Sequence, residues 1–270
     1  MRIGVSNLLW TSDQDEAVAG LLNQRGIDTI DVAPTRYFDD LNGASSAGLL
    51  AVRNFWRDRG ITITGMQSLL HGTEGLNVFG DGETRRRTRA SLRAAMRVGA
   101  ELGARQLVFG SWRNRDRGML TMAAAEDSAA DFFAEAATDA ARLGLCLTIE
   151  PISGRYGNNF LIDHHEAARL VERVDLPSFR LTLDIGCAGL AQEDIAEIVR
   201  RHERLISHVQ LAEYALAPLN AGNPWHEHAG PLVRGALPGR VACIEGLKPP
   251  DISSLDAIAQ SLDVAQRHYG

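Results

Sequence analysis

Hydrophobic and polar positions along the chain repeat as one unit, in which an amphipathic stretch ends in glycine and leads straight into a short apolar run. The unit occurs at residues 21–32, 55–66, 100–110 and 141–150. Glycine adopts the left-handed conformation of a helix C-terminus at low steric cost, so helices are predicted to end at Gly26, Gly60, Gly103 and Gly144. Apolar runs without strict alternation are typical of strands that are covered on both faces of a parallel sheet. The pattern therefore predicts alternating helices and parallel strands.

The same pattern continues to the end of the chain and gives eight strands and eight helices. Strands are predicted at residues 2–5, 29–32, 61–66, 106–109, 146–150, 180–184, 206–211 and 241–245. Helices are predicted near residues 13–25, 46–58, 84–102, 122–143, 164–173, 192–203, 227–235 and 254–267. Eight strand–helix units in 270 residues predict an α/β fold of the (β/α)8 TIM barrel type.

An open, doubly wound sheet is the competing fold. Such a sheet usually carries a glycine-rich phosphate loop after its first strand, whereas residues 6–13 of this chain read SNLLWTSD. No linker rich in proline, glycine or serine divides the chain. We therefore expect one barrel domain over residues 1–270.

The charge balance excludes several classes of protein. The chain has 28 basic and 34 acidic side chains and a net charge of −6, without a basic tail, which argues against a nucleic-acid partner. No stretch approaches the roughly 20 apolar residues of a membrane span, and the N-terminus does not resemble a signal peptide. Cys146, Cys187 and Cys243 form neither a zinc motif nor a disulfide framework. The expected location is the cytoplasm.

Polar side chains gather at the ends of the last four predicted strands. Three of these strands end in Glu150, Asp184 and Glu245, and the strand at residues 206–211 carries His208 and Gln210 on one face. In a (β/α)8 barrel the C-terminal strand ends surround the catalytic pocket. Three carboxylates that converge there repel one another unless a cation neutralises them, since a buried charge needs a partner.

The candidate metal ligands are therefore Glu150, Asp184, Gln210 and Glu245, which all offer oxygen. Oxygen donors favour Mn²⁺ or Mg²⁺ over Zn²⁺. An alternative is that these acids form ion pairs at the strand ends with arginines such as Arg155 or Arg180.

Several segments together resemble the xylose-isomerase-like TIM barrels, in particular the sugar phosphate isomerase and epimerase group. The resemblance covers nearly the whole chain and lies in VSNLLW, IDVAPTRYF, MQSLLHG, VFGSWRNRDRG, IEPISGRYGNNFL, LTLDIG, HVQLAE and CIEG. Enzymes of that group hold a metal through Glu, Asp, His and Glu at the ends of strands five to eight. The resemblance places these roles on Glu150, Asp184, Gln210 and Glu245.

Two positions depart from the family pattern. Gln210 stands where the family usually has a histidine ligand, and Cys187 stands where many epimerases have a histidine that polarises the substrate carbonyl. A glutamine is a neutral and weaker ligand, and a thiol is a poorer hydrogen-bond donor than imidazole. The departures bear on the reaction more than on the fold.

The resemblance implies a divalent-metal-dependent sugar epimerase or isomerase. Glu150 and Glu245 would be the catalytic acid and base on opposite faces of a keto-sugar or sugar phosphate, with an enediolate between the two proton transfers. Return of the proton to the opposite face gives epimerisation, and return to the neighbouring carbon gives aldose–ketose isomerisation.

Eight residues around the predicted pocket are candidates for substrate binding: His71, Trp112, Arg113, Arg155, Cys187, His208, Glu213 and His228. Arg115 is expected beside Arg113 at the rim, facing a phosphate or carboxylate. His164 and His165 begin a predicted helix and are expected on the surface.

Alternative functions stay open at this stage. A lyase on the same scaffold, such as an inosose-type dehydratase or an oxo-glycoside-cleaving enzyme, begins with the same proton abstraction. A barrel that has lost its metal is supported by Gln210 alone. An abasic-site endonuclease is disfavoured because its zinc ligands are rich in histidine and because the chain is acidic. The expected partner is a small carbohydrate, and a homodimer is possible.

Overall fold

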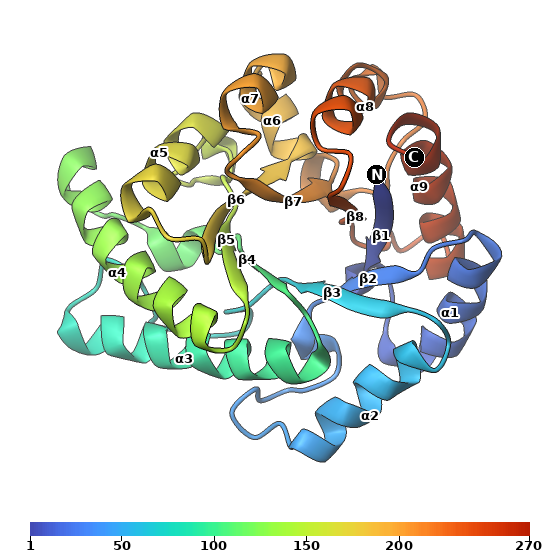
Figure 1. Cartoon of the computed structure of the whole chain (residues 1–270), viewed down its shortest axis with the longest axis horizontal. Coiled ribbons are helices and arrows are strands. Elements are labelled where there is room, and N and C mark those ends of the chain that lie inside the picture. Colours follow the sequence, from blue (N-terminus) through green and yellow to red (C-terminus); the bar gives the residue numbers. More distant parts are fainter.

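The computed structural model describes residues 1–270 and closes eight parallel strands into one barrel, with each strand beside the next in sequence and β8 beside β1. Figure 1 shows the strands as a ring with the helices outside it. The strands are β1 (Arg2–Ser6), β2 (Thr29–Val32), β3 (Thr62–Met66), β4 (Gln106–Phe109), β5 (Cys146–Ile149), β6 (Phe179–Asp184), β7 (Ile206–Leu211) and β8 (Val241–Ile244). The predicted (β/α)8 barrel is confirmed, and every predicted strand is found within one residue of its expected ends.

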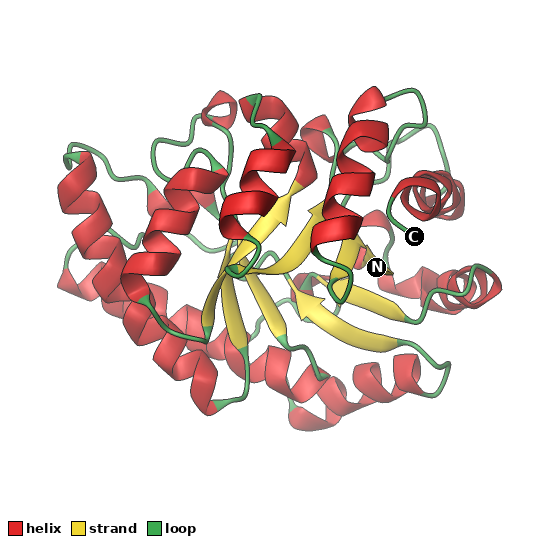
Figure 2. Cartoon of the chain, turned by 45° about the horizontal axis from the view of Figure 1, so that its top comes forward, coloured by secondary structure: helices red, strands yellow, loops and turns green.

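Nine α-helices surround the barrel, where eight were predicted (Figure 2). They are α1 (Asp15–Gln24), α2 (Ser46–Arg57), α3 (Gly82–Leu102), α4 (Met122–Arg142), α5 (His164–Val174), α6 (Ile185–Ala191), α7 (Ile195–His202), α8 (Pro224–Ala236) and α9 (Ser254–His268). The additional helix is α6, which directly follows β6. Its sequence IGCAGLA has no polar face and contains two glycines, so the periodicity gave no sign of it.

The four glycines predicted at helix ends all have the expected backbone conformation. Gly26, Gly60, Gly103 and Gly144 have φ between 68° and 94°. Residues other than glycine are strained at these φ values, which explains why the repeated unit has glycine at this point. No helix has the length and apolar character that a membrane crossing would need.

The barrel interior is not purely apolar below the strand ends. Asp31 on β2 and His208 on β7 are almost fully buried. Since β2 and β7 are not neighbours in the ring, the contact between these side chains crosses the barrel interior. His208 Nε2 lies 2.9 Å from Asp31 Oδ2 without hydrogen-bond geometry, and Thr64 donates a hydrogen bond to the other oxygen, Oδ1. A Cβ at Gly65 would overlap the Asp31 carboxylate. Glycine at position 65 therefore makes room for a buried acid.

Candidate active site

A cavity of about 450 Å³ opens at the C-terminal ends of the strands, where a (β/α)8 barrel carries its chemistry. Glu150 follows β5, Asp184 ends β6 and Glu245 follows β8, and all three line the cavity. We call these three residues the carboxylate cluster. Each of them is less than 10% exposed. The cluster therefore faces the cavity while being almost entirely shielded from bulk water.

Glu150 has room for its carboxylate because the residue opposite it on β4's end is a glycine. A Cβ at Gly110 would overlap Glu150 Oε2. From the other side, Arg115 Nη1 donates a hydrogen bond to the backbone oxygen of Glu150 at 2.8 Å. Two residues after β4 thus position Glu150: Gly110 leaves room for its carboxylate, and Arg115 binds its backbone oxygen.

Asp184 is held by the start of the next helix and by a buried histidine. Its Oδ1 accepts a hydrogen bond from the backbone N–H of Cys187 at 2.9 Å, which caps α6. Its own N–H donates to His164 Nε2 at 3.1 Å, while His164 Nδ1 lies 2.6 Å from Glu193 Oε2. His164 is fully buried, so the expectation that it lies on the surface is wrong. The fold uses it to connect a buried glutamate to the end of β6.

Glu245 is hydrogen-bonded by two neutral side chains. Gln67, which follows β3, donates from Nε2 to Glu245 Oε1, and Gln210 on β7 donates from Nε2 to Oε2 at 2.7 Å. Both glutamines are almost fully buried. Their Oε1 atoms have no hydrogen-bond partner. Buried amide oxygens of this kind are uncommon, and each marks a place where a ligand could bind.

The carboxylate cluster holds its protons more strongly than exposed acids do. Burial, followed by the charges of Glu245 and Asp184, raises the pKa of Glu150 well above its usual range. Burial, followed by the charges of Asp184 and Asp31, raises the pKa of Glu245 to about 8. Burial also raises the pKa of Asp184, although the N–H of Cys187 opposes the shift. Three buried acids with raised pKa values at one place are typical of a functional site.

Arg115 is a cation beside this cluster, and it does not line the cavity. The side chain is fully buried, and its Nε and Nη2 atoms have no hydrogen-bond partner. The expectation that Arg115 lies at the rim is therefore wrong. A single guanidinium supplies one positive charge against three carboxylates.

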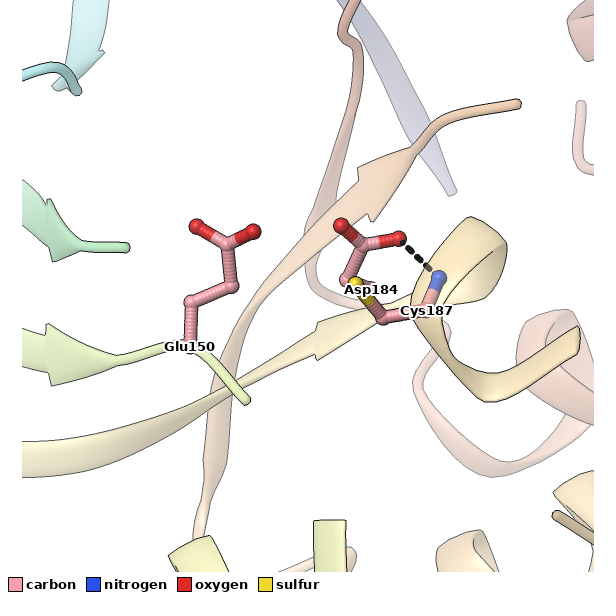
Figure 3. Close-up of side chains that lie close together, drawn as sticks. All are labelled: Glu150, Asp184 and Cys187. Carbon is pink, nitrogen blue, oxygen red and sulfur yellow. Dashed lines mark hydrogen bonds between the residues drawn. The ribbon is translucent and has the colours of Figure 1, made fainter. Parts of the chain in front are cut away.

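The donor set fits a metal ion. One oxygen each of Glu150 and Asp184 and the Sγ of Cys187 lie within 4.8 Å of one another, and all three residues are buried (Figure 3). Gln210 Oε1 adds a buried oxygen with no partner. A divalent cation would offset the burial and mutual repulsion of these carboxylates by favouring their charged forms.

The structure brings five of the eight predicted substrate-binding residues to the cavity wall and leaves three outside it. The lining residues are His71, Trp112, Arg113, Cys187 and Glu213. Arg155 is exposed in the loop after β5, and His228 is exposed on α8. His208 lies deeper in the barrel beside Asp31. Gln210, one of the predicted metal ligands, does not line the cavity and contacts the carboxylate cluster by its hydrogen bond to Glu245.

Glu213 lines the cavity but is fully engaged in holding its own loop. It accepts hydrogen bonds from the backbone N–H of Asn220 and from Asn223 Nδ2, and it lies 3.2 Å from His226 Nε2. These partners, led by His226, lower the pKa of Glu213 despite its burial. His226, rather than His228, is the histidine of this segment that connects to the site.

Sequence reasoning missed Gln67 and Tyr156 at the cavity. Gln67 stands in the segment MQSLLHG, where the histidine drew attention and the neutral amide did not. Tyr156 lines the cavity, stacks on Tyr214 with ring centroids 6.0 Å apart, and accepts a hydrogen bond from the N–H of Ala215. The two tyrosines join the loops after β5 and β7, and no local sequence signal indicates such a contact.

Comparisons with known proteins agree with this architecture. A family model described as a xylose isomerase-like TIM barrel matches residues 20–267. A protein named as a putative hydroxypyruvate isomerase from Danio rerio is 33% identical over 72 residues, which is 26% of this chain and 26% of that protein. The match therefore spans about a quarter of each protein.

Solved structures share the whole fold at low sequence identity. A D-psicose 3-epimerase solved in the presence of D-fructose has a TM-score of 0.82 and 18% identity, with 100% of both chains covered. A 3-keto-D-glucoside 4-epimerase from E. coli has a TM-score of 0.78 and 16% identity over 96% of this chain and 98% of that one. A protein named IolI, solved with a zinc atom, has a TM-score of 0.75 and 14% identity over 100% of both chains.

Proposed function

Because the chain belongs to the xylose isomerase-like TIM barrel family, we propose that it is a divalent-metal-dependent epimerase or isomerase of a keto-sugar or sugar phosphate. The similarity to a D-psicose 3-epimerase and to a 3-keto-D-glucoside 4-epimerase supports a carbohydrate substrate. The cytoplasmic location and a homodimer stay predictions from the sequence.

The observation that carries the proposal is the buried carboxylate cluster at the cavity wall. Glu150 and Glu245 both have raised pKa values and both line the cavity. A general acid or base works best when its pKa lies near the working pH, and burial of a glutamate moves it in that direction. A cavity of about 450 Å³ accommodates a small sugar.

We assign proton transfer to Glu150 and Glu245. One glutamate removes the proton from the carbon next to the substrate carbonyl, and the other glutamate returns a proton on the opposite face. Gln67 and Gln210 hold the Glu245 carboxylate by one hydrogen bond on each oxygen, which fixes its orientation toward the cavity. Arg115 donates a hydrogen bond to the backbone oxygen of Glu150 and so positions the start of the following loop.

Glu150, Asp184, Gln210 and Glu245 are the residues that we expect to hold the cation. When bound, a divalent cation supplies Lewis-acid polarisation of the substrate carbonyl. Trp112 and Tyr156 line the cavity with aromatic faces of the kind that commonly contact sugar rings.

The test is proton exchange on candidate substrates. The purified protein, loaded separately with Mn²⁺, Mg²⁺, Co²⁺ or Zn²⁺, is incubated in deuterated water with a panel of ketopentoses, ketohexoses and their phosphates, and products are followed by NMR. We expect deuterium at the carbon next to the carbonyl together with an epimer or aldose. Glu150→Gln and Glu245→Gln are expected to lose about 10²-fold or more of the rate, the usual contribution of a positioned acid or base.

Glu227→Gln, on the exposed face of α8, is the matched control and is expected to keep full activity. Full activity in either cluster variant would overturn the assignment of the catalytic pair. Loss of water or of an aglycone, with deuterium in the product, would identify the lyase alternative instead.

A further inference from the structure

The thiol of Cys187 lies among the carboxylates rather than elsewhere on the cavity wall. Its Sγ, one oxygen of Glu150 and one oxygen of Asp184 lie within 4.8 Å of one another. Figure 3 shows Asp184 and Cys187 next to each other, with the Glu150 carboxylate facing them. Donor atoms at about 2.0–2.3 Å from one ion lie within such a distance of each other. The separations are compatible with all three atoms binding a single ion.

The backbone around Cys187 is fixed, which makes the thiol a built part of the site. Its N–H donates to Asp184 Oδ1 at 2.9 Å. The preceding residue, Gly186, packs so closely on β7's end that a Cβ there would lie 2.8 Å from the backbone oxygen of Ala212. Cys187 is only 7% exposed and still lines the cavity.

The other two cysteines lie elsewhere, although burial and then the charges of Asp31 and Glu245 raise the pKa of the Cys243 thiol. Cys146 Sγ lies 3.8 Å from the backbone oxygen of Leu147, and Cys243 Sγ lies 3.7 Å from the backbone oxygen of Ile244. Neither of them lines the cavity. Cys187 is thus the cysteine that combines burial, carboxylate neighbours and access to the cavity.

Glu245 is engaged differently from Glu150 and Asp184. Each of its carboxylate oxygens already accepts a hydrogen bond from a glutamine amide, Gln67 on one side and Gln210 on the other. Gln210 turns its nitrogen, which cannot bind a cation, toward Glu245. Glu150, Asp184 and Cys187 therefore offer donors that no glutamine amide occupies, and the Oε1 atom of Gln210 adds an oxygen without a partner.

We infer that Cys187 is a direct ligand of the cation, together with Glu150 and Asp184, and that the site selects a thiophilic divalent ion such as Zn²⁺ or Co²⁺ over Mg²⁺ and Mn²⁺. A soft thiolate favours these ions, whereas oxygen ligands alone favour Mg²⁺ and Mn²⁺. When the ion binds, the S–H bond of Cys187 breaks, the proton leaves to solvent and the metal–sulfur bond forms. The inference rests on the proposed metal-dependent function. It names Zn²⁺ or Co²⁺ in place of the Mn²⁺ or Mg²⁺ that the sequence favours.

Cobalt spectroscopy tests the inference without relying on activity. The metal-free protein is titrated with Co²⁺, and the near-ultraviolet thiolate-to-cobalt charge-transfer band is recorded. We expect the band to grow to one equivalent in the native protein and in Cys146→Ser, and to be absent in Cys187→Ser. We also expect Cys187→Ser to bind Zn²⁺ at least about tenfold more weakly, as the loss of a group supporting a metal site does, with little change for Mn²⁺.

The outcomes separate this inference from the proposed function. If the native protein binds one equivalent of Co²⁺ without the band and epimerises sugars, the ligands are oxygens, the inference is wrong and the proposed function stands. If the native protein binds no divalent ion, both fail. The band of the native protein is decisive even where Cys187→Ser unfolds, and Cys187→Ala serves as the second variant.

Discussion

At the scale of a single residue, the absence of a side chain at Gly110 leaves the space that the Glu150 carboxylate occupies beside the cavity. A methyl group at this position would occupy the space of the Glu150 carboxylate, although the backbone of Gly110 is not in the left-handed region. An alanine there is therefore compatible with the local backbone but not with the neighbouring acid. The constraint on residue 110 comes from the site and not from the fold.

Gly110→Ala is expected to reduce turnover by about 10²-fold, because a displacement of about 1 Å at a reacting group has an effect of this size. Steady-state kinetics on the best substrate of the exchange screen measures it. Gly20→Ala is the matched control, since a Cβ at this exposed position in α1 meets no other atom. That control is expected to keep activity and to gain up to about 1 kcal/mol of stability. Equal activity of the two variants would contradict the role given to Gly110.

The residues that sequence reasoning located and those it missed differ in charge. Glu150, Asp184 and Glu245 could be located because a carboxylate at the end of an apolar strand is unusual and costly. Gln67 is neutral, so its presence at the end of β3 gave no comparable signal, although it donates a hydrogen bond to Glu245. Arg115 was noticed, but its burial cannot be determined from a loop sequence that contains two other arginines and an aspartate. Charge at strand ends was therefore predictable, and the neutral and buried partners were not.

At the scale of elements, the junction of α5 with β6 positions Asp184. The buried side chain of His164, the first residue of α5, accepts from the Asp184 N–H and lies beside Glu193, which follows α6. Burial opposes ionisation of Glu193, but the hydrogen bonds with His164 lower its pKa overall. Three elements are thereby joined at one strand end.

His164→Ala is expected to lower the free energy of unfolding by about 1–3 kcal/mol, because Glu193 loses the imidazole partner of Oε2 and keeps only the backbone N–H on Oε1. It is also expected to weaken metal binding by about 10–100-fold, as the loss of a supporting partner does. Urea unfolding and metal titration measure the two effects. His228→Ala, on the exposed face of α8, should change neither quantity. Unchanged metal affinity in His164→Ala would show that the histidine serves stability alone.

Strand positions were predictable to within one residue, whereas the helix content after β6 was not. Buried parallel strands read as short apolar runs, and glycine with φ near 70–90° marks the preceding helix end. The short helix α6 lacks an amphipathic stripe because it is packed between the strand end and the loop after β7. A short helix that is apolar on all sides gives no periodic signal.

At the scale of the whole molecule, the carboxylate cluster makes the metal-free fold sensitive to pH. The pKa of Glu245 is raised to about 8, so the folded chain keeps a proton that the unfolded chain releases above about pH 4.5. A state that binds more protons when folded loses stability as the pH rises. The loss therefore extends from about pH 5 to pH 8, and each pH unit contributes up to about 1.4 kcal/mol per acid.

Urea unfolding with a chelator at several pH values between about 5 and 8 measures this loss. We expect Glu245→Gln to reduce the slope, because the neutral amide has no proton to release, and Glu227→Gln to keep it. Saturating metal is expected to flatten the slope for the native protein. Metal binding releases protons from its ligands, so the stabilisation by the ion grows with pH and offsets the loss. A metal-free stability that does not change over this range would contradict the electrostatic description of the cluster.

The two hydrogen bonds on Glu245 also impose an order on the maturation of the site during folding. Gln210 and Glu245 are 35 residues apart, but Gln67 and Glu245 are 178 residues apart. Contacts between distant residues form late, because the entropy of closing the loop is lost before the contact stabilises anything. A chain in which β5 to β8 have assembled already gathers its acids, while the second hydrogen bond on Glu245, from Gln67, forms only when the ring closes. The chemistry of this barrel therefore becomes available only in the last step of its folding.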